Sequence, residues 1–234
     1  MTLAQRIDHT CGRITAAMDA CGRRDRCVLE LAVKTRTPDT CREAARLLAE
    51  RELPVLLGHN RVQEARATAE AIREVPGARI HLIGPLQSNK VNQALGAVDL
   101  IETVDSTALV ERLDHRVSRR FPVFVQVNTS GEPSKHGCAP RDVPHVVAAV
   151  EMASHLYLHG FMTVGLNSAE ESAVRESYAR LRHVRDIAAE RLCTTDGDLA
   201  LSMGMSADLE WAIAEGATIV RVGSAVFGPR PPLT

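Results

Sequence analysis

One lysine, Lys34, stands at the end of the apolar segment 27–33. A lysine at the edge of a buried strand is partly removed from water, which lowers the pKa of its ammonium and suits an amine that forms an imine with an aldehyde. The alternative is a lysine whose stem packs on the strand end while its charge stays in water. The context of Lys34 therefore has to decide its role.

Two later segments have the composition of an anion site. The segment 202–206 precedes a predicted helix, whose free N–H groups and dipole favour a phosphate. The segment 221–224 offers backbone amides, a hydroxyl and the guanidinium of Arg221. Taken separately, Ser206 is better explained as a helix cap and Gly223 as a close-packed glycine. The candidate phosphate-binding residues are Ser202, Gly204, Ser206, Gly223 and Ser224.

Three further polar residues carry weaker signals. Asn60 follows an apolar segment that ends in glycine, and it either caps the next helix or hydrogen-bonds a ligand ring. His59 and His81 have no carboxylate partner in a recognisable triad, and His81 lies within an apolar segment, so we expect a structural histidine there. No Ser-His-Asp order, zinc-protease motif or P-loop occurs.

Short apolar segments rich in β-branched residues alternate with helical patterns along the chain. The predicted strands are 27–33, 54–58, 79–84, 98–104, 122–128, 156–164, 199–203 and 218–223. The predicted helices are 3–21, 38–51, 60–74, 87–95, 106–119, 141–153, 169–191 and 206–215.

This alternation predicts the α/β class: a single (β/α)8 TIM barrel formed by one domain, residues 1–234. Only the proline-rich segment 227–234 follows the last strand, so the extra N-terminal helix fills the vacant place in the outer ring. A doubly wound open sheet is the competing architecture.

A barrel brings the ends of its strands together at one face, where function collects. Lys34 then lies across the mouth from the segments that follow strands seven and eight, which is the usual phosphate site of such barrels. A lysine facing a phosphate site favours a phosphorylated aldehyde, and we expect pyridoxal 5′-phosphate.

The composition excludes several other classes of protein. The 234 residues carry 28 basic and 29 acidic side chains and only 3% aromatic residues, which argues against nucleic-acid binding. No apolar stretch is long enough for a membrane helix, and no signal peptide is evident. The six cysteines are scattered without metal-site spacing, so we expect a cytoplasmic protein.

Five segments resemble the pyridoxal phosphate homeostasis protein family: 58–64, 81–90 (His-Leu-Ile-Gly-Pro-Leu-Gln-Ser-Asn-Lys), 127–137, 201–210 (with Ser-Met-Gly-Met-Ser) and 220–228. The resemblance implies a barrel like the N-terminal domain of alanine racemase, a cofactor bound as a Schiff base, and a role in vitamin B6 supply. It places the Schiff base on Lys34, the phosphate on the five residues given above, Arg221 at the ring or phosphate, and Asn60 beside the cofactor.

The chain departs from the family pattern near the lysine. The family usually has one residue between Lys-Thr and proline, whereas Arg36 and Thr37 both precede Pro38 here, which we interpret as one extra loop residue. The alternative register places Thr35 at the lysine position and abolishes imine formation. In addition, His59 replaces the family's usual glutamate, and Arg61 replaces a residue that is commonly tyrosine.

The resemblance favours a carrier over an enzyme. Alanine racemase adds a second domain that carries a tyrosine acid–base group, and the short tail leaves no room for it. We therefore expect a monomeric pyridoxal phosphate reservoir that supplies apo-enzymes, with a narrow racemase or lyase as the alternative.

Overall fold

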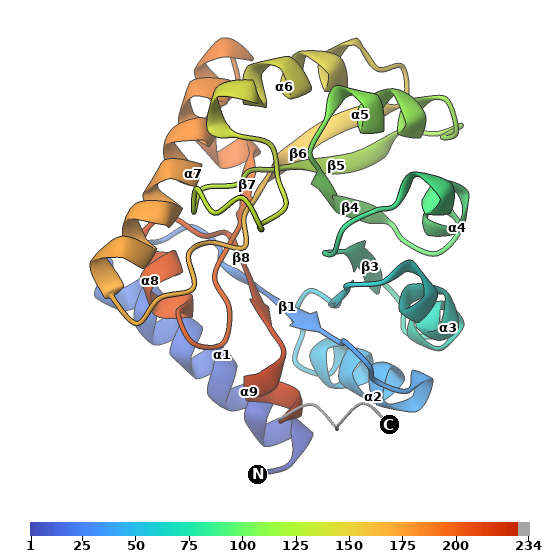
Figure 1. The fold of residues 1–234 in the computed structure, drawn as a ribbon. Coiled ribbons are helices and arrows are strands. Elements are labelled where there is room, and N and C mark those ends of the chain that lie inside the picture. The colour runs from blue at the N-terminus through green and yellow to red at the C-terminus, as the bar shows by residue number, and fades with distance from the viewer. Residues whose placement is uncertain (229–234) are drawn as a thin grey trace.

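Eight parallel strands close into a barrel, each pairing with the next along the chain and β8 pairing with β1 (Figure 1). The computed structural model describes residues 1–228, apart from the side chain of residue 196. All eight predicted strands are confirmed, and closure excludes the doubly wound open sheet. The strands are β1 (Val28–Ala32), β2 (Leu56–His59), β3 (Arg79–Leu82), β4 (Leu100–Val104), β5 (Phe121–Gln126), β6 (Leu156–Met162), β7 (Ala200–Ser202) and β8 (Ile219–Val222).

Helices surround the barrel and follow most of the strands (Figure 1). They are α1 (Leu3–Ala20), α2 (Pro38–Ala49), α3 (Val62–Arg73), α4 (Val91–Leu95), α5 (Thr107–Asp114), α6 (Val143–Met152), α7 (Glu171–Arg191), α8 (Leu209–Ala214) and α9 (Ser224–Phe227). The part of the chain that the structure describes also contains three 3₁₀ turns: η1 (Ser88–Lys90), η2 (Pro140–Asp142) and η3 (Asp196–Asp198).

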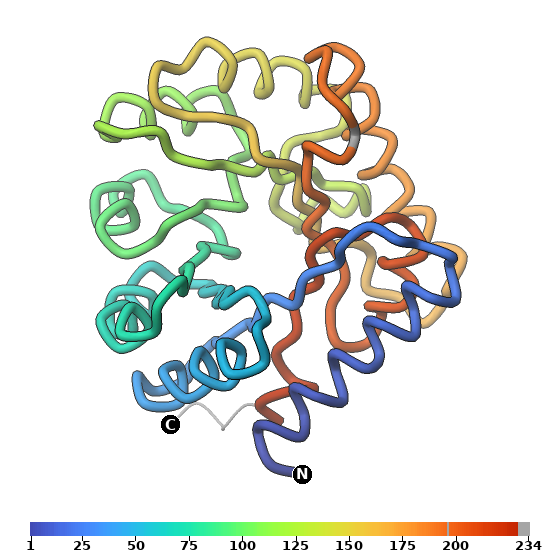
Figure 2. Tube along the Cα trace, turned by 180° about the vertical axis from the view of Figure 1, so that it is seen from behind, coloured from blue at the N-terminus to red at the C-terminus, as the bar shows by residue number. Residues whose placement is uncertain are grey.

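The N-terminal helix α1 occupies the vacant place in the outer ring, as the sequence predicts. It packs between α2 on one side and α8 and α9 on the other, which Figure 2 shows from behind. Arg13 of α1 forms an ion pair with Glu210 of α8 at 2.7 Å, and Asp8 pairs with Arg51 at 2.6 Å. The tail after strand eight forms a single helical turn, α9, and residues 229–234 lie outside the described residues.

The core lies between the strands and the helices and is built from aliphatic side chains. Leu31 and Val33 are fully buried in this layer. Burying a side chain of this kind stabilises the fold by about 1.5–3 kcal/mol. Successive side chains of a strand face opposite ways, so Glu30, Ala32 and Lys34 share the other face of the chain, toward the barrel interior.

No helix within residues 1–228 has both the length and the apolar character needed to cross a membrane.

Candidate functional site

Lys34 lies two residues after the end of β1, at the C-terminal end of the barrel, where it lines a cavity of ≈ 210 Å³. The cavity is formed by Ala32, Lys34, Arg36, Met205, Ser206, Ala207, Arg221, Gly223, Ser224 and Gly228. Three of these ten described residues are cationic and none is acidic. The cavity is therefore suited to an anionic ligand.

The loop after Lys34 contains a strained residue. Thr35 has a φ of 58°, in the left-handed region that a β-branched residue rarely adopts, and its side chain is exposed. Thr37 then caps α2 by accepting a hydrogen bond from the Thr40 N–H at 3.3 Å, with Pro38 in the first helical turn. Lys34 lines the cavity and Thr35 does not, and the assignment of the family's lysine position to Lys34 stays a prediction.

The two predicted anion-binding segments meet at this cavity. Ser206, Gly223 and Ser224 all line it, and the Ala225 N–H donates to Ser206 Oγ at 3.3 Å, which joins the segments. The backbone at Gly223 comes close to β1, since a Cβ there would lie 3.1 Å from the Ala32 carbonyl oxygen. These three residues lie where the sequence predicts them.

The helix after β7 differs from the prediction. It begins at Leu209 rather than at Ser206, because residues 206–208 form a turn in which the Met205 N–H donates to the Asp208 carboxylate at 2.6 Å. Ser206 therefore neither caps this helix nor presents its N-terminus. Ser206 and Ala207 of this turn line the cavity instead.

Gly204 and Ser202 do not line the cavity but support the residues that do. Gly204 has a φ of 91°, and a Cβ there would lie 2.5 Å from Ala212 Cβ, so only glycine fits. Its carbonyl accepts from the Arg221 N–H at 3.0 Å. Ser202 is fully buried, and its Oγ accepts from Arg221 at 2.6 Å. Both residues hold Arg221 in place.

Arg221 is itself buried but reaches the cavity. Besides its contact with Ser202, its guanidinium donates to the Thr163 carbonyl at 2.6 Å. Two short hydrogen bonds from opposite ends of a planar guanidinium fix its orientation.

Asn60 does not cap a helix. The N-cap position of α3 is occupied by Arg61, which makes no side-chain capping bond. Asn60 Oδ1 is buried and has no hydrogen-bond partner among the described residues. Gly84 packs tightly on its backbone, since a Cβ at Gly84 would lie 2.1 Å from the Asn60 carbonyl oxygen. Asn60 is not among the residues that line the cavity.

His59 faces away from the cavity, toward α3. It is fully buried, and its Nε2 lies 3.0 Å from Thr68 Oγ1, while Nδ1 has no hydrogen-bond partner among the described residues. Burial lowers the pKa of His59 to about 4, so the ring is neutral near pH 7. The replacement of the family's glutamate therefore adds no charge here.

A buried polar chain crosses the barrel below the cavity, and the sequence interpretation missed it. His81 Nδ1 lies 3.0 Å from Oε1 of both Glu30 and Glu102. Glu102 also accepts from Ser202 Oγ at 2.5 Å, which continues the chain to Arg221. The expectation that His81 has no carboxylate partner is wrong. The sequence does contain a signal for this chain: Glu30, His81 and Glu102 are each a polar residue within an apolar strand, and all three side chains face the barrel interior.

The buried polar chain from Glu30 to Arg221 contains both positive and negative charges. Burial alone would lower the pKa of His81, but the two carboxylates outweigh it and raise the pKa to about 10. Burial and the Glu102 charge raise the pKa of Glu30, whereas His81, Arg221 and Ser202 outweigh burial and lower the pKa of Glu102. Glu30, His81 and Glu102 are close enough to share a metal ion, but the protonated Nδ1 of His81 already occupies the space between the carboxylates.

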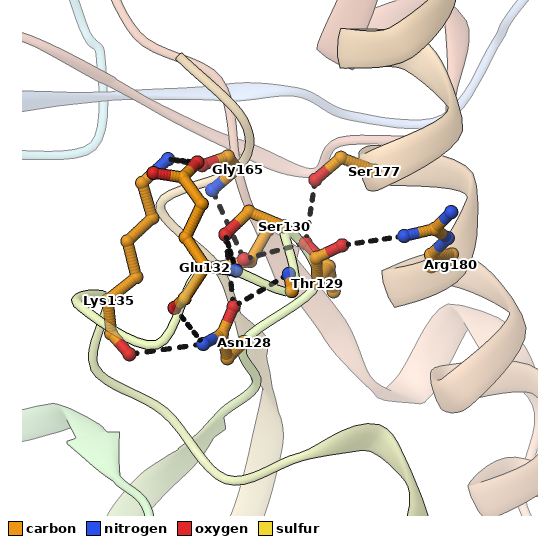
Figure 3. Close-up of polar contacts among 10 residues, drawn as sticks. Asn128, Thr129, Ser130, Glu132, Lys135, Gly165, Ser177 and Arg180 are labelled. Carbon is orange, nitrogen blue, oxygen red and sulfur yellow. Dashed lines mark hydrogen bonds and ion pairs between the residues drawn. The ribbon is translucent and has the colours of Figure 1, made fainter.

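A second polar network fixes the loop after β5 (Figure 3). Thr129 Oγ1 contacts the hydroxyls of Thr163 at 3.0 Å and Ser177 at 2.8 Å. Lys135 forms an ion pair with Glu132 at 2.9 Å and donates to the Gly165 carbonyl at 2.6 Å. These contacts position Thr163, whose carbonyl binds Arg221, so the loop contributes to the site indirectly.

Comparison with known proteins gives full-length matches. The family described as alanine racemase, N-terminal domain, matches residues 33–231. The pyridoxal phosphate homeostasis protein of Pseudomonas aeruginosa is 38% identical over 98% of this chain and 96% of its own, and that of Escherichia coli K12 is 33% identical over 97% of each.

Solved structures show the same fold. PipY of Synechococcus elongatus, solved with PLP bound, is 28% identical with a TM-score of 0.80 and covers 97% of this chain and 100% of its own. An unknown protein from Bifidobacterium adolescentis is 34% identical, with a TM-score of 0.87 over 96% of this chain and 94% of its own. Alanine racemase of Clostridium difficile is only 15% identical, with a TM-score of 0.73, and the match spans 97% of this chain but 57% of the racemase.

Proposed function

Because this chain belongs to the pyridoxal phosphate homeostasis protein family, we propose that it binds pyridoxal 5′-phosphate (PLP) in the C-terminal cavity, attached to Lys34 as an imine. When bound, PLP supplies an aldehyde that condenses with a primary amine. The observation that carries the proposal is the position of Lys34 in a cationic cavity that Ser206, Gly223 and Ser224 also line.

The residues present fit the cofactor. Among the described residues, Lys34 is the one amine in the wall of the cavity, and the serine hydroxyls and the glycine backbone on the opposite segments suit a phosphate. Arg36 adds positive charge and is held over the Phe227 ring, with 5.3 Å between the guanidinium carbon and the ring centroid. Arg221, fixed by Ser202 and Thr163, would lie beside the ring or phosphate. The position of Asn60 beside the cofactor stays a prediction, because Asn60 does not line the cavity.

We infer that the protein acts as a carrier or reservoir in vitamin B6 homeostasis rather than as a racemase or lyase. Racemisation needs groups that remove and return a proton on both faces of the substrate. Tyr157 lies at the opposite end of the barrel. Tyr178 is buried and donates to Asp208 at 2.9 Å, and burial raises its pKa. Apart from Lys34, no residue of the usual acid–base types lines the cavity within the described chain.

Titration with PLP, followed by visible absorption, tests the binding. We expect wild type and Lys90→Arg to develop the absorption band of a lysine imine, because Lys90 lies in η1, outside the cavity. Lys34→Arg keeps the charge but cannot form the imine, so it should lack the band. An unchanged band in Lys34→Arg would overturn the assignment.

Transfer assays separate the carrier from the enzyme. Loaded protein should restore activity to a PLP-dependent apo-enzyme with a stoichiometry of one cofactor per chain. Incubation with L-amino acids should give no D-enantiomer and no keto acid. Sustained turnover of either kind would contradict the carrier role and favour the racemase or lyase.

We further propose that residues 1–234 act as one monomeric unit in the cytoplasm. All six cysteines are free thiols in the structure, which is typical of a reducing compartment. Light scattering should give the mass of one 25.4 kDa chain, with and without PLP. A mass of twice that value would refute the monomer.

A further inference from the structure

The barrel has a second opening at the opposite end from Lys34. A cavity of ≈ 960 Å³ lies there and is lined by residues from the first or second positions of all eight strands. We call it the N-terminal mouth. Its volume falls within the range of small-molecule sites, which is about 300–1,000 Å³. Nothing in the proposed function uses this end of the barrel.

The N-terminal mouth is strongly basic although the whole chain has a net charge of −1. Its lining includes three aspartates, Asp25, Asp99 and Asp198. It also includes six arginines, Arg23, Arg26, Arg79, Arg119, Arg120 and Arg185. This local excess of cations raises the concentration of anions at the opening.

The aspartates are already engaged. Asp25 pairs with Arg23 at 2.5 Å. Asp99 accepts from the Ile80 N–H at 2.9 Å, and Asp198 accepts from the hydroxyls of Thr194 and Thr195, at 2.8 Å each. Within residues 1–228, none of these three aspartates is therefore paired with Arg26, Arg79, Arg119 or Arg120.

Four arginines of the mouth have no carboxylate partner among the described residues. Arg120 stacks on Tyr157, with 4.7 Å between the guanidinium carbon and the ring centroid. Arg26, Arg79 and Arg119 are exposed and form no ion pair within residues 1–228. Four cations around one opening present several donor forks to a ligand.

His81 forms part of the floor of this cavity. The residue is only 5% exposed, and its Nδ1 is held by the two carboxylates of the buried chain. Its other nitrogen, Nε2, has no hydrogen-bond partner among the described residues. Because His81 is protonated, Nε2 carries a hydrogen that needs an acceptor. A protonated ring nitrogen that makes no hydrogen bond within the described residues, in the floor of a basic cavity, suits an anionic ligand.

We propose that the N-terminal mouth binds a small anion carrying a chain of two or three phosphates, either free or on a nucleoside. Arginine forks match phosphate oxygens, and four separated cations match several negative charges better than one. Tyr157 and His159, whose ring centroids are 6.2 Å apart, offer aromatic surface to a base. The concave site suits a small molecule rather than a nucleic-acid strand.

Calorimetric titration of the full chain with tripolyphosphate, ATP and AMP tests the proposal. Tripolyphosphate and ATP should bind with one site per chain, and AMP at least 10-fold more weakly, because it offers fewer charges. Equal affinity for ATP and tripolyphosphate would show that the phosphates alone are recognised. Tighter binding of ATP would show that the rings of Tyr157 and His159 also contact the base. Both results support the site.

Paired variants locate the binding. Arg79→Gln/Arg119→Gln removes two exposed arginines of the mouth and should weaken tripolyphosphate binding at least 10-fold. Arg66→Gln/Arg141→Gln removes the same charge from exposed positions outside the mouth and should change it less than 2-fold. His81→Gln should also weaken binding. PLP binding should persist in both double variants, so this test is independent of the Lys34 proposal.

Three results would overturn the proposal. One is the absence of heat for all three anions at low ionic strength. Another is an equal loss of affinity in the two double variants. The third is tighter binding of a single-stranded oligonucleotide than of ATP, with the same dependence on Arg79 and Arg119, which would assign the mouth to nucleic acid.

Discussion

His59 should make the fold sensitive to acid. In the folded protein its ring is fully buried and its pKa is lowered to about 4, whereas an unfolded chain gives the ordinary value near 6.5. The unfolded state therefore binds a proton more readily between these values. The stabilising effect of the neutral ring is complete above pH 6.5 and is lost as the pH falls through 4.

The structure gives the size of this effect. Each pKa unit corresponds to about 1.4 kcal/mol, so the full loss is roughly 3 kcal/mol, and about 2 kcal/mol is lost by pH 5. The physical cause is burial, which removes the charged ring from water. Nδ1 also has no hydrogen-bond partner among the described residues, so a proton there would be buried without an acceptor. Solvent does not screen this effect, because the ring is buried.

Urea unfolding at pH 7 and pH 5 measures this loss of stability. His59→Gln cannot titrate and keeps a donor for Thr68, so its stability should fall less between the two pH values than that of wild type, by about 2 kcal/mol. His9→Gln makes the same change at an exposed histidine and should follow wild type. Equal pH dependence in His59→Gln and wild type would refute the assignment of a neutral, dry His59.

Two further substitutions test how the fold positions the site. Gly84→Ala places a Cβ 2.1 Å from the Asn60 carbonyl, so it should destabilise the protein by about 1–3 kcal/mol in urea unfolding and weaken PLP binding; an unchanged unfolding midpoint would contradict the close approach. Thr35→Gly relieves the strain of a threonine in the left-handed region, about 1–2 kcal/mol, although the entropy of glycine in the unfolded chain offsets most of this gain. The glycine variant should therefore be at least as stable as wild type, whereas Thr35→Val, which keeps a β-branched side chain, should be less stable than the glycine variant. Equal stability of the glycine and valine variants would show that Thr35 is unstrained.

Much of the fold could be predicted from the sequence because its signals are local. The β-branched segments mark the strands, and Thr37-Pro38 marks the start of α2. The prediction was wrong at α8, where Ser206 suggested a cap. Asp208 accepts from the Met205 N–H and forms a turn first, and such competition between side chain and backbone is not visible in the spacing.

The site could be predicted only in part. The sequence predicts that Lys34 lies close to the segments after β7 and β8, because the topology of a barrel places the ends of β1, β7 and β8 side by side. The direction of each side chain depends on the register of its strand, so the outward turn of His59 and the burial of Ser202 against Arg221 did not follow from position in the sequence. The chain from Glu30 to Arg221 joins residues on separate strands, and only the closed barrel reveals it.

Reductive trapping of the bound cofactor tests the central proposal most directly. The sequence contains three lysines, Lys34, Lys90 and Lys135, so borohydride reduction of PLP-loaded protein followed by peptide mass mapping has three possible outcomes on lysine. We predict that the pyridoxyl group appears on Lys34, at one per chain. Label on Lys90 or Lys135, or unlabelled Lys34 in protein that retains PLP, would contradict the account.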